Sequence, residues 1–271
     1  MVVVGNVAMM KGVQASERPS CGNDKPSIED LCDAVVDHLA PTVSDSRRGV
    51  VALAGSVAVG KSTLSEELAR CLSKRGLEAT VVSTDGFLLP NRVLGPLGLA
   101  FVKGLPQTYD WAALRSFACL ARDAQATLLI PVYSHVSFDA DATGCVGPGR
   151  MVIVEGINAL HPLAAGLADV SIYLDAPDET IANWYVSRFV RLIEAAETNP
   201  ASFYCRFVDL DESDRIEVAR SVWDSINLPN LQHHIAPTKS AADIVVTLTD
   251  NHVLSRIKAG PATSGHCNQR A

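Results

Sequence analysis

Residues 55–63, GSVAVGKST, combine glycines, a lysine and hydroxyl side chains in a spacing that can bind phosphate. They fit the Walker A pattern, in which four residues separate Gly55 from Gly60 and Lys61 and Ser62 follow. Backbone N–H groups of such a loop converge on phosphate oxygens, and the helix that follows adds partial positive charge. Lys61 can reach the β- and γ-phosphates, and the Ser62 hydroxyl can bind Mg²⁺. The predicted nucleotide-binding residues are Gly55, Ser56, Val57, Ala58, Val59, Gly60, Lys61, Ser62 and Thr63.

Two acidic residues stand where strands end, which is where a P-loop site needs carboxylates. Asp85 follows ATVVST, and Glu155 follows the apolar run MVIV. The carboxyl ends of strands in an open α/β sheet form the usual ligand crevice. Asp85 could instead be a simple turn residue before a glycine, whereas a carboxylate such as Glu155 is costly beside an apolar strand unless a cation pairs with it. We expect Asp85 to be a catalytic base and Glu155 to be a metal-side or structural carboxylate.

Two further stretches could form the acceptor half of a phosphoryl-transfer site. The stretch PVYSH ends a strand and brings Tyr133 close to His135. The helix expected after Pro177 carries Tyr185 and Arg188 three residues apart, so both lie on one face. An arginine near a P-loop can stabilise charge on the transferring phosphoryl group. Taken singly, the tyrosines and the histidine are more often ordinary core or rim residues.

The fold class follows from how apolar strands alternate with helices. The predicted strands are residues 51–56, 79–84, 127–133, 151–156, 170–176 and 243–249. A helix is expected over SIEDLCDAVVDHLA (27–40), where Pro41 ends it, and further helices begin at Lys61, near Asp110, at Asp178 and near Asp211. The strands are apolar nearly throughout, as expected when helices cover both faces of a sheet. This pattern predicts an α/β protein with a mainly parallel sheet flanked by helices on both faces.

Composition and chain organisation limit the classes of function. The chain has 271 residues, a net charge of −7 and seven cysteines without a Cys-x-x-Cys pair. The acidic balance argues against nucleic acid or an anionic membrane as the main partner. The cysteines favour reduced thiols in a cytoplasmic protein over a disulfide framework or a zinc site. We expect a flexible leader over 1–27, a single kinase-type domain over 28–258 and a disordered tail over 259–271.

The order of the motifs resembles the bacterial-type (type I) pantothenate kinases. The resemblance covers roughly residues 50 to 255 and rests on TDGF, PVYSH and WYxxRF more than on the Walker A pattern. The matching stretches are GSVAVGKST (55–63), STDGFLLPN (83–91), KGLPQTYD (103–110), PVYSH (131–135), EGINAL (155–160), SIYLDAP (171–177), WYVSRF (184–189), INxxNL (226–231) and NH (251–252).

The resemblance implies a P-loop kinase that transfers the γ-phosphoryl group of ATP to pantothenate, the first step toward coenzyme A. It implies catalytic roles for Asp85, Lys61 and Arg188, with Lys61 and Ser62 holding the phosphates and Mg²⁺, and Glu155 is the further candidate metal ligand by its position at a strand end. The implied pantothenate-binding residues are Asp85, Tyr133, His135, Tyr185, Arg188 and Asn227, and His252 would lie near the adenine. The resemblance also implies a homodimer.

The sequence departs from the family in several places. The segment before the P-loop is shorter than in the family, and Phe203 and Phe207 stand where tyrosines are usual. Two lost hydroxyls remove two hydrogen bonds, each contributing about 0.5–1.5 kcal/mol. Glu66 and Leu192 replace an arginine and a phenylalanine that help the family bind coenzyme A, and an acid repels its phosphates. We therefore expect weakened feedback inhibition by coenzyme A.

Two alternatives stay open at this point. The protein could be a P-loop kinase of another small alcohol, such as uridine, a sugar or glycerate. It could also be a catalytically weak regulatory protein that binds a nucleotide or coenzyme A. The joint presence of Lys61, Ser62, Asp85 and Arg188 argues against the second alternative, because a degenerate relative would be expected to lack at least one of them.

Overall fold

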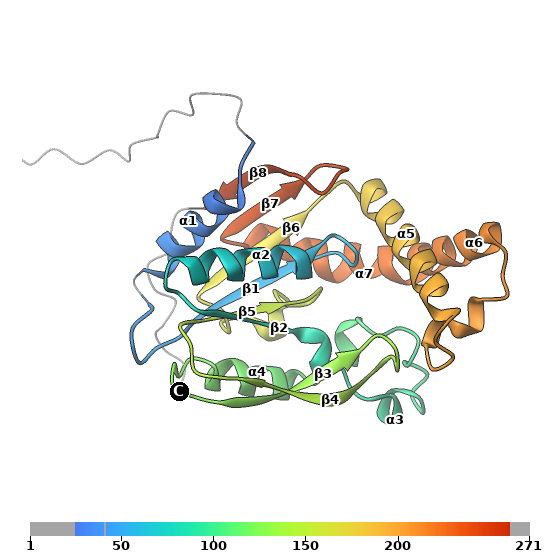
Figure 1. Cartoon of the computed structure of the whole chain (residues 1–271), viewed down its shortest axis with the longest axis horizontal. Coiled ribbons are helices and arrows are strands. Elements are labelled where there is room, and N and C mark those ends of the chain that lie inside the picture. The colour runs from blue at the N-terminus through green and yellow to red at the C-terminus, as the bar shows by residue number, and fades with distance from the viewer. Residues whose placement is uncertain (1–24, 41, 261–271) are drawn as a thin grey trace, which may run out of the picture.

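A six-stranded sheet forms the centre of the computed structural model, which describes residues 25–40 and 42–260 (Figure 1). The strand order is β2-β5-β1-β6-β7-β8, and only β8 runs antiparallel to its neighbour. The strands are β1 (Gly49–Gly55), β2 (Ala79–Ser83), β5 (Met151–Glu155), β6 (Val170–Asp175), β7 (Ile244–Leu248) and β8 (Leu254–Ala259). The predicted mainly parallel sheet is therefore confirmed, whereas β8 was not predicted.

Helices cover both faces of this sheet, as the apolar strands predict. Successive residues of β1 point to opposite faces: Val51 packs in one core with Leu68 and Leu72, and Val50 packs in another with Phe117. The first core belongs to α2 and the second to α4. The helices that flank the sheet are α1 (Ile28–Leu39), α2 (Lys61–Lys74) and α4 (Trp111–Leu120). No helix within residues 25–40 and 42–260 is long and apolar enough to cross a membrane.

A separate hairpin contains one of the predicted strands. The run TLLIPVY does form a strand, β3 (Leu128–Ser134), but it pairs only with β4 (Asp139–Val146) in an antiparallel ribbon outside the central sheet. The β4 sequence DADATGCV is poor in β-branched and aromatic residues, so local preference does not reveal it. Leu129 is 77% exposed because the ribbon has one open face.

The second half of the chain adds a helical layer beyond the P-loop end of the sheet. The long helix α5 (Asp178–Ala196) packs against α6 (Glu212–Val222), on the right of Figure 1. Asp211 caps α6 by accepting from the Asp214 N–H at 2.9 Å, as its predicted start requires. Shorter turns are η1 (Thr84–Phe87), α3 (Asn91–Leu94), η2 (Pro106–Thr108), η3 (Pro162–Ala164), η4 (Phe203–Phe207), η5 (Trp223–Asn227), α7 (Leu228–Asn230), η6 (Leu231–Ile235) and η7 (Ala236–Ala241).

The boundaries expected from the sequence are only partly within the described residues. Helix α1 begins at Ile28, with Ser27 as its N-cap, and β8 ends at Ala259. The proposed leader and tail fall mostly on residues 1–24 and 261–271, which lie outside the described residues, so the three-part division stays a prediction.

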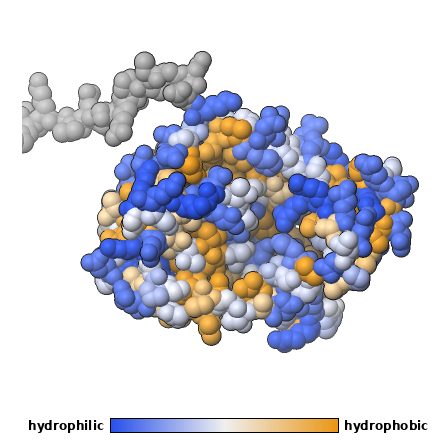
Figure 2. Space-filling model, viewed as in Figure 1, coloured by the Kyte–Doolittle hydropathy of each residue, from blue (hydrophilic) through white to orange (hydrophobic). Residues whose placement is uncertain are grey.

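Hydrophilic residues cover much of the face seen in Figure 2, with apolar residues exposed between them.

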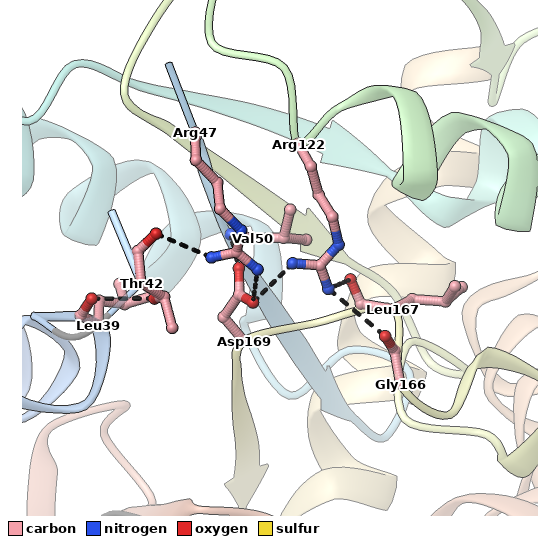
Figure 3. A network of polar contacts seen from close by, with 8 residues as sticks. All are labelled: Leu39, Thr42, Arg47, Val50, Arg122, Gly166, Leu167 and Asp169. Atoms are coloured by element: carbon pink, nitrogen blue, oxygen red, sulfur yellow. Dashed lines mark hydrogen bonds and ion pairs between the residues drawn. The ribbon is translucent and has the colours of Figure 1, made fainter. Parts of the chain in front are cut away.

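One buried carboxylate joins the amino-terminal ends of β1 and β6 (Figure 3). Asp169 accepts from Arg47 at 2.8 Å, from Arg122 at 2.6 Å and from the Val50 N–H at 2.9 Å. Burial alone would raise the pKa of Asp169, but these hydrogen bonds outweigh burial and hold the pKa below its ordinary value. Arg47 also donates to the Thr42 carbonyl oxygen at 2.8 Å, so the network ties the segment after α1 to the sheet.

We predict that Asp169→Asn lowers the free energy of unfolding by about 2–3 kcal/mol at pH 7, because two arginines lose their carboxylate. Since the folded pKa lies below the unfolded value of about 4, the wild-type contribution is present above that pH and fades as the pH falls through the folded pKa. Urea unfolding at pH 7 and pH 3 should therefore show a smaller difference between wild type and variant at pH 3.

The control is Asp45→Asn. Asp45 is 95% exposed and pairs with Arg150 at 2.7 Å, so its loss should change stability by less than about 0.5 kcal/mol. Equal effects of the two substitutions would contradict the structural role of Asp169.

Candidate active site

The glycine-rich loop joins β1 directly to α2, in the strand–loop–helix context that phosphate binding requires. Gly55 has φ +153°, and a Cβ there would lie 2.4 Å from the Leu174 carbonyl oxygen, so a side chain would push the loop off β6. Helix α2 begins at Lys61, and the Nζ of Lys61 donates to the Ser56 carbonyl oxygen at 2.7 Å. The helix N-terminus and a buried ammonium group thus face the same end of the sheet.

Glu155 is the carboxylate that accompanies this buried lysine. It is 6% exposed at the end of β5 and accepts from the Ser62 hydroxyl at 3.3 Å. Burial raises the pKa of Glu155, and the nearby ammonium of Lys61 opposes the shift. Burial likewise lowers the pKa of Lys61, and the negative charges of Glu155 and Asp85 oppose this decrease. The two charges are therefore held in low-dielectric surroundings, where they act strongly on a bound ligand.

Strand register explains why these groups meet. Glu155 pairs with Leu53 of β1 on one side and with Ser83 of β2 on the other. The P-loop follows β1 and the turn that carries Asp85 follows β2, so both segments leave the sheet beside Glu155. Carboxyl ends of adjacent parallel strands thereby place Lys61 and Asp85 in one crevice, as the sequence predicts.

Asp85 lies in η1, a turn that packs closely on the hairpin. The turn begins at Ser83, whose hydroxyl accepts from the Asp85 N–H at 3.3 Å. A Cβ on Gly86 would lie only 2.1 Å from the Pro131 carbonyl oxygen, so only glycine allows this approach of η1 to β3. The Tyr109 hydroxyl donates to Asp85 at 3.4 Å. The turn thus couples the position of Asp85 to the strand that carries PVYSH.

The predicted acceptor residues lie around the same crevice. The rings of Tyr133 and His135 meet edge to face at 5.2 Å between centroids. Burial lowers the pKa of His135, and the positive charge of Arg188 lowers it further, so the imidazole is neutral at pH 7. Burial raises the pKa of Tyr185, which keeps its hydroxyl protonated as a hydrogen-bond donor. Arg188 also acts on Lys61, which places this guanidinium near the P-loop.

One cavity of about 790 Å³ contains both halves of the site. The predicted residues that line it are Val57, Ala58, Lys61, Ser62, Asp85, Tyr133, His135, Glu155, Tyr185, Arg188 and Asn227. The predicted P-loop residues that do not line it are Gly55, Ser56, Val59, Gly60 and Thr63. Its size is that of a small-molecule site.

His252 lies apart from this cavity. Its ring stacks on Trp184 at 3.8 Å, and its Nδ1 would lie 3.7 Å from a Cβ on Gly60. The residue therefore sits on the outer side of the P-loop, where a nucleotide base could reach it. Its predicted role beside the adenine stays a prediction.

Several cavity residues were not singled out from the sequence. Lys103 lies under the rings of Tyr133 and Phe138, 5.4 Å from each centroid, and its side chain is 2% exposed. It falls in the stretch KGLPQTYD, whose resemblance to the family was the available signal. Other lining residues that were missed include Phe101, Phe138, Tyr204 and Arg206. Tyr204 places a phenol beside the Phe203 ring in the cavity wall.

Magnesium is the metal that these residues fit. Among the residues that the structure describes, no three His, Cys, Asp or Glu side chains group into a metal site. The Ser62 hydroxyl and the Glu155 carboxylate instead present two hard oxygen ligands 3.3 Å apart. Mg²⁺ suits such a pair, because it usually binds one or two protein oxygens together with substrate phosphates and water.

Comparisons with known proteins agree with this fold and with a phosphotransferase. Residues 50–191 match the phosphoribulokinase/uridine kinase family. A pantothenate kinase from Enterobacter sp. (strain 638) is 34% identical over 83% of this chain and 76% of its own length, and one from Yersinia enterocolitica has the same identity and coverage. A solved structure from Silicibacter sp. TM1040, a proposed fructose transport system kinase, is 30% identical with a TM-score of 0.62, covering 80% of this chain and 95% of its own. D-glycerate 3-kinase from Cryptococcus neoformans shares the fold, with a TM-score of 0.62 at 15% identity over 86% of this chain and 99% of its own.

The strand–loop–helix cradle and the carboxylates at the strand ends define a P-loop phosphotransferase. The chain belongs to the phosphoribulokinase/uridine kinase family and, by its identity with relatives over most of their length, to the pantothenate kinases.

We predict that Gly86→Ala lowers kcat about 100-fold, because the new methyl group must displace η1 from β3 and misplace Asp85. Affinity for a fluorescent ATP analogue should stay within about twofold, since the P-loop is untouched. Steady-state kinetics and a fluorescence titration measure the two effects.

Gly147→Ala is the matched control. No atom lies within 4 Å of a Cβ at this position, so activity should not change. A normal kcat in Gly86→Ala would disprove the coupling between η1 and the hairpin.

Proposed function

We propose that this protein transfers the γ-phosphoryl group of ATP to the primary hydroxyl of pantothenate, forming 4′-phosphopantothenate. The observation that carries the proposal is the single cavity that joins the P-loop lysine, Asp85 and a wall of tyrosine, histidine, arginine and asparagine side chains. Membership of the pantothenate kinases supports the choice of acceptor. The product would commit pantothenate to the synthesis of coenzyme A.

The donor half has a defined set of roles in this proposal. The P-loop backbone and Lys61 bind the phosphates, and Ser62 and Glu155 hold Mg²⁺, which supplies charge neutralisation between the phosphates when it is bound. Arg188 neutralises charge that develops on the transferring group. Phosphoryl transfer depends mainly on such positioning and electrostatics, so buried charges are well suited to it.

The acceptor half positions and activates the hydroxyl. Asp85 accepts its proton as the oxygen attacks the γ-phosphorus, and the bond to the β–γ bridging oxygen breaks. Tyr133, His135, Tyr185 and Asn227 line the acceptor half and supply hydrogen bonds to the polar groups of pantothenate. A polar-lined site of this kind rejects analogues that lack the matching groups.

The proposal predicts Mg-ATP-dependent ADP release with pantothenate that exceeds the release with uridine, fructose or D-glycerate. Coupled ADP assays at millimolar acceptor measure this preference, and mass spectrometry identifies the phosphorylated product. Asp85→Asn is the control: it should bind ATP normally but lose kcat by at least about 100-fold, because the general base is gone.

Two results would overturn the proposal. Absence of pantothenate-dependent ADP release at millimolar substrate would remove pantothenate as the acceptor, and a preference for fructose, uridine or D-glycerate would identify another small-alcohol kinase. Near-normal turnover of Asp85→Asn would remove Asp85 from the role of base.

We also propose that coenzyme A inhibits this enzyme weakly. Glu66 is exposed on α2, one turn beyond the P-loop, and Leu192 lines the cavity on α5. A carboxylate near bound phosphates opposes an anionic inhibitor. Initial rates with coenzyme A equal in concentration to ATP should fall by less than about twofold, and Glu66→Arg should increase the inhibition. Strong inhibition of the wild type that competes with ATP would contradict this.

We further propose that the enzyme works as a homodimer, by resemblance to the family, and in the cytoplasm, where cysteines without a Cys-x-x-Cys pair stay reduced. The acidic composition agrees with a small-molecule substrate rather than a nucleic acid.

A further inference from the structure

Arg206 stands at the acceptor end of the cavity, and the proposed reaction gives it no role. It lies on η4 and lines the cavity together with Phe101 and Phe203. Its guanidinium carbon lies 4.1 Å from the centroid of the Phe203 ring and 5.6 Å from that of Phe101. An arginine stacked on aromatic faces in this way keeps its planar edge available for a ligand.

The position of Arg206 is held by contacts to the β3–β4 hairpin. The Phe203 N–H donates to the Val136 carbonyl oxygen at 3.0 Å, and the Phe203 ring stacks on Phe138 at 4.2 Å. The Arg206 Nε in turn donates to the Phe203 carbonyl oxygen at 3.0 Å. These contacts orient the guanidinium before any ligand arrives.

The terminal nitrogens of Arg206 are available for binding. Among the residues that the structure describes, no carboxylate pairs with Arg206, and its only hydrogen bond is the one from Nε. Lys103, by contrast, already contacts the Phe138 carbonyl oxygen at 2.6 Å and Asp139 at 3.4 Å. Lys61 is engaged in the P-loop, and Arg188 acts on it from nearby. Arg206 is therefore the cation best placed for the end of the acceptor that does not react.

A chain of contacts separates Arg206 from the reacting end. The turn η1, which carries Asp85, packs through Gly86 on β3, which carries Tyr133, and the Tyr133 ring meets Phe138 at 6.0 Å. Phe138 stacks on Phe203, and the Arg206 guanidinium lies over the Phe203 ring. An acceptor with its hydroxyl at Asp85 would lie along these aromatic rings and present its other end to Arg206. Pantothenate carries its carboxylate at the end opposite its primary hydroxyl.

We propose that Arg206 determines specificity by binding the carboxylate of the acceptor through its two terminal nitrogens. This inference rests on the proposed function, because it assumes that pantothenate is the acceptor. A guanidinium matches a carboxylate with two parallel hydrogen bonds, whereas a neutral amide offers one weaker acceptor. The enzyme should therefore prefer pantothenate over its primary amide, which has nearly the same shape.

The test compares pantothenate and its primary amide as acceptors in the wild type, Arg206→Met and Arg206→Lys. Arg206→Met should raise KM for pantothenate about tenfold, the effect of one charge-assisted contact, with kcat within about twofold. KM for the amide should change less than about twofold, so the preference for the acid disappears. Arg206→Lys should lie between, because an ammonium keeps the charge but not the planar fork.

The control is Arg256→Met on β8, an exposed arginine that does not line the cavity, and it should leave both substrates unaffected. Equal losses for acid and amide in Arg206→Met would show a structural role and overturn the inference, as would no loss for either. Wild-type failure to phosphorylate pantothenate is a separate result, which overturns the proposed function and this inference with it.

Discussion

The structure depends on the burial of the Lys61 ammonium at the end of β1. A buried cation is tolerated only when carboxylates and carbonyl oxygens compensate it, and here Ser56 supplies a carbonyl oxygen and Glu155 a carboxylate. Glu155 can do this because β5 lies between β1 and β2 in a parallel register. The same register brings Asp85 to the P-loop. One electrostatic requirement thus governs the strand order around the donor half of the site.

The acceptor half follows a different rule, because it is built from elements outside the sheet. The β3–β4 ribbon, α5 and η4 meet over the strand ends and are joined by close packing rather than by sheet pairing. Gly86 against Pro131 joins η1 to the ribbon, and Phe203 against Phe138 joins η4 to it. This arrangement keeps the phosphate-binding groups on the sheet, while the residues that line the acceptor half lie on elements packed over the strand ends, and binding residues commonly occur on such peripheral segments.

Sequence reasoning succeeded where one short stretch of sequence predicts both the function of a residue and the element that positions it. The P-loop motif predicts both the strand and helix around it and the ligand that it binds. Asp85 and Glu155 follow apolar strands that the sheet brings together. Reasoning failed for β4, whose Asp, Ala and Gly residues have little preference for strands and pair only because β3 is adjacent. It also missed Lys103 and Arg206, because Lys103 contacts rings about 30 residues further along the chain, and the position of Arg206 in the cavity depends on how its turn is oriented.

By itself, the sequence determined the fold class, the phosphate cradle and the family, because these depend on periodicity and on motifs of adjacent residues. Only the tertiary structure decided that β3 leaves the central sheet, that Gly86 lies against Pro131 and that Arg206 stands over Phe203 in the wall of the cavity. These features join residues far apart in the chain or depend on how a turn is oriented. Packing sets such contacts, and local sequence preference does not encode them.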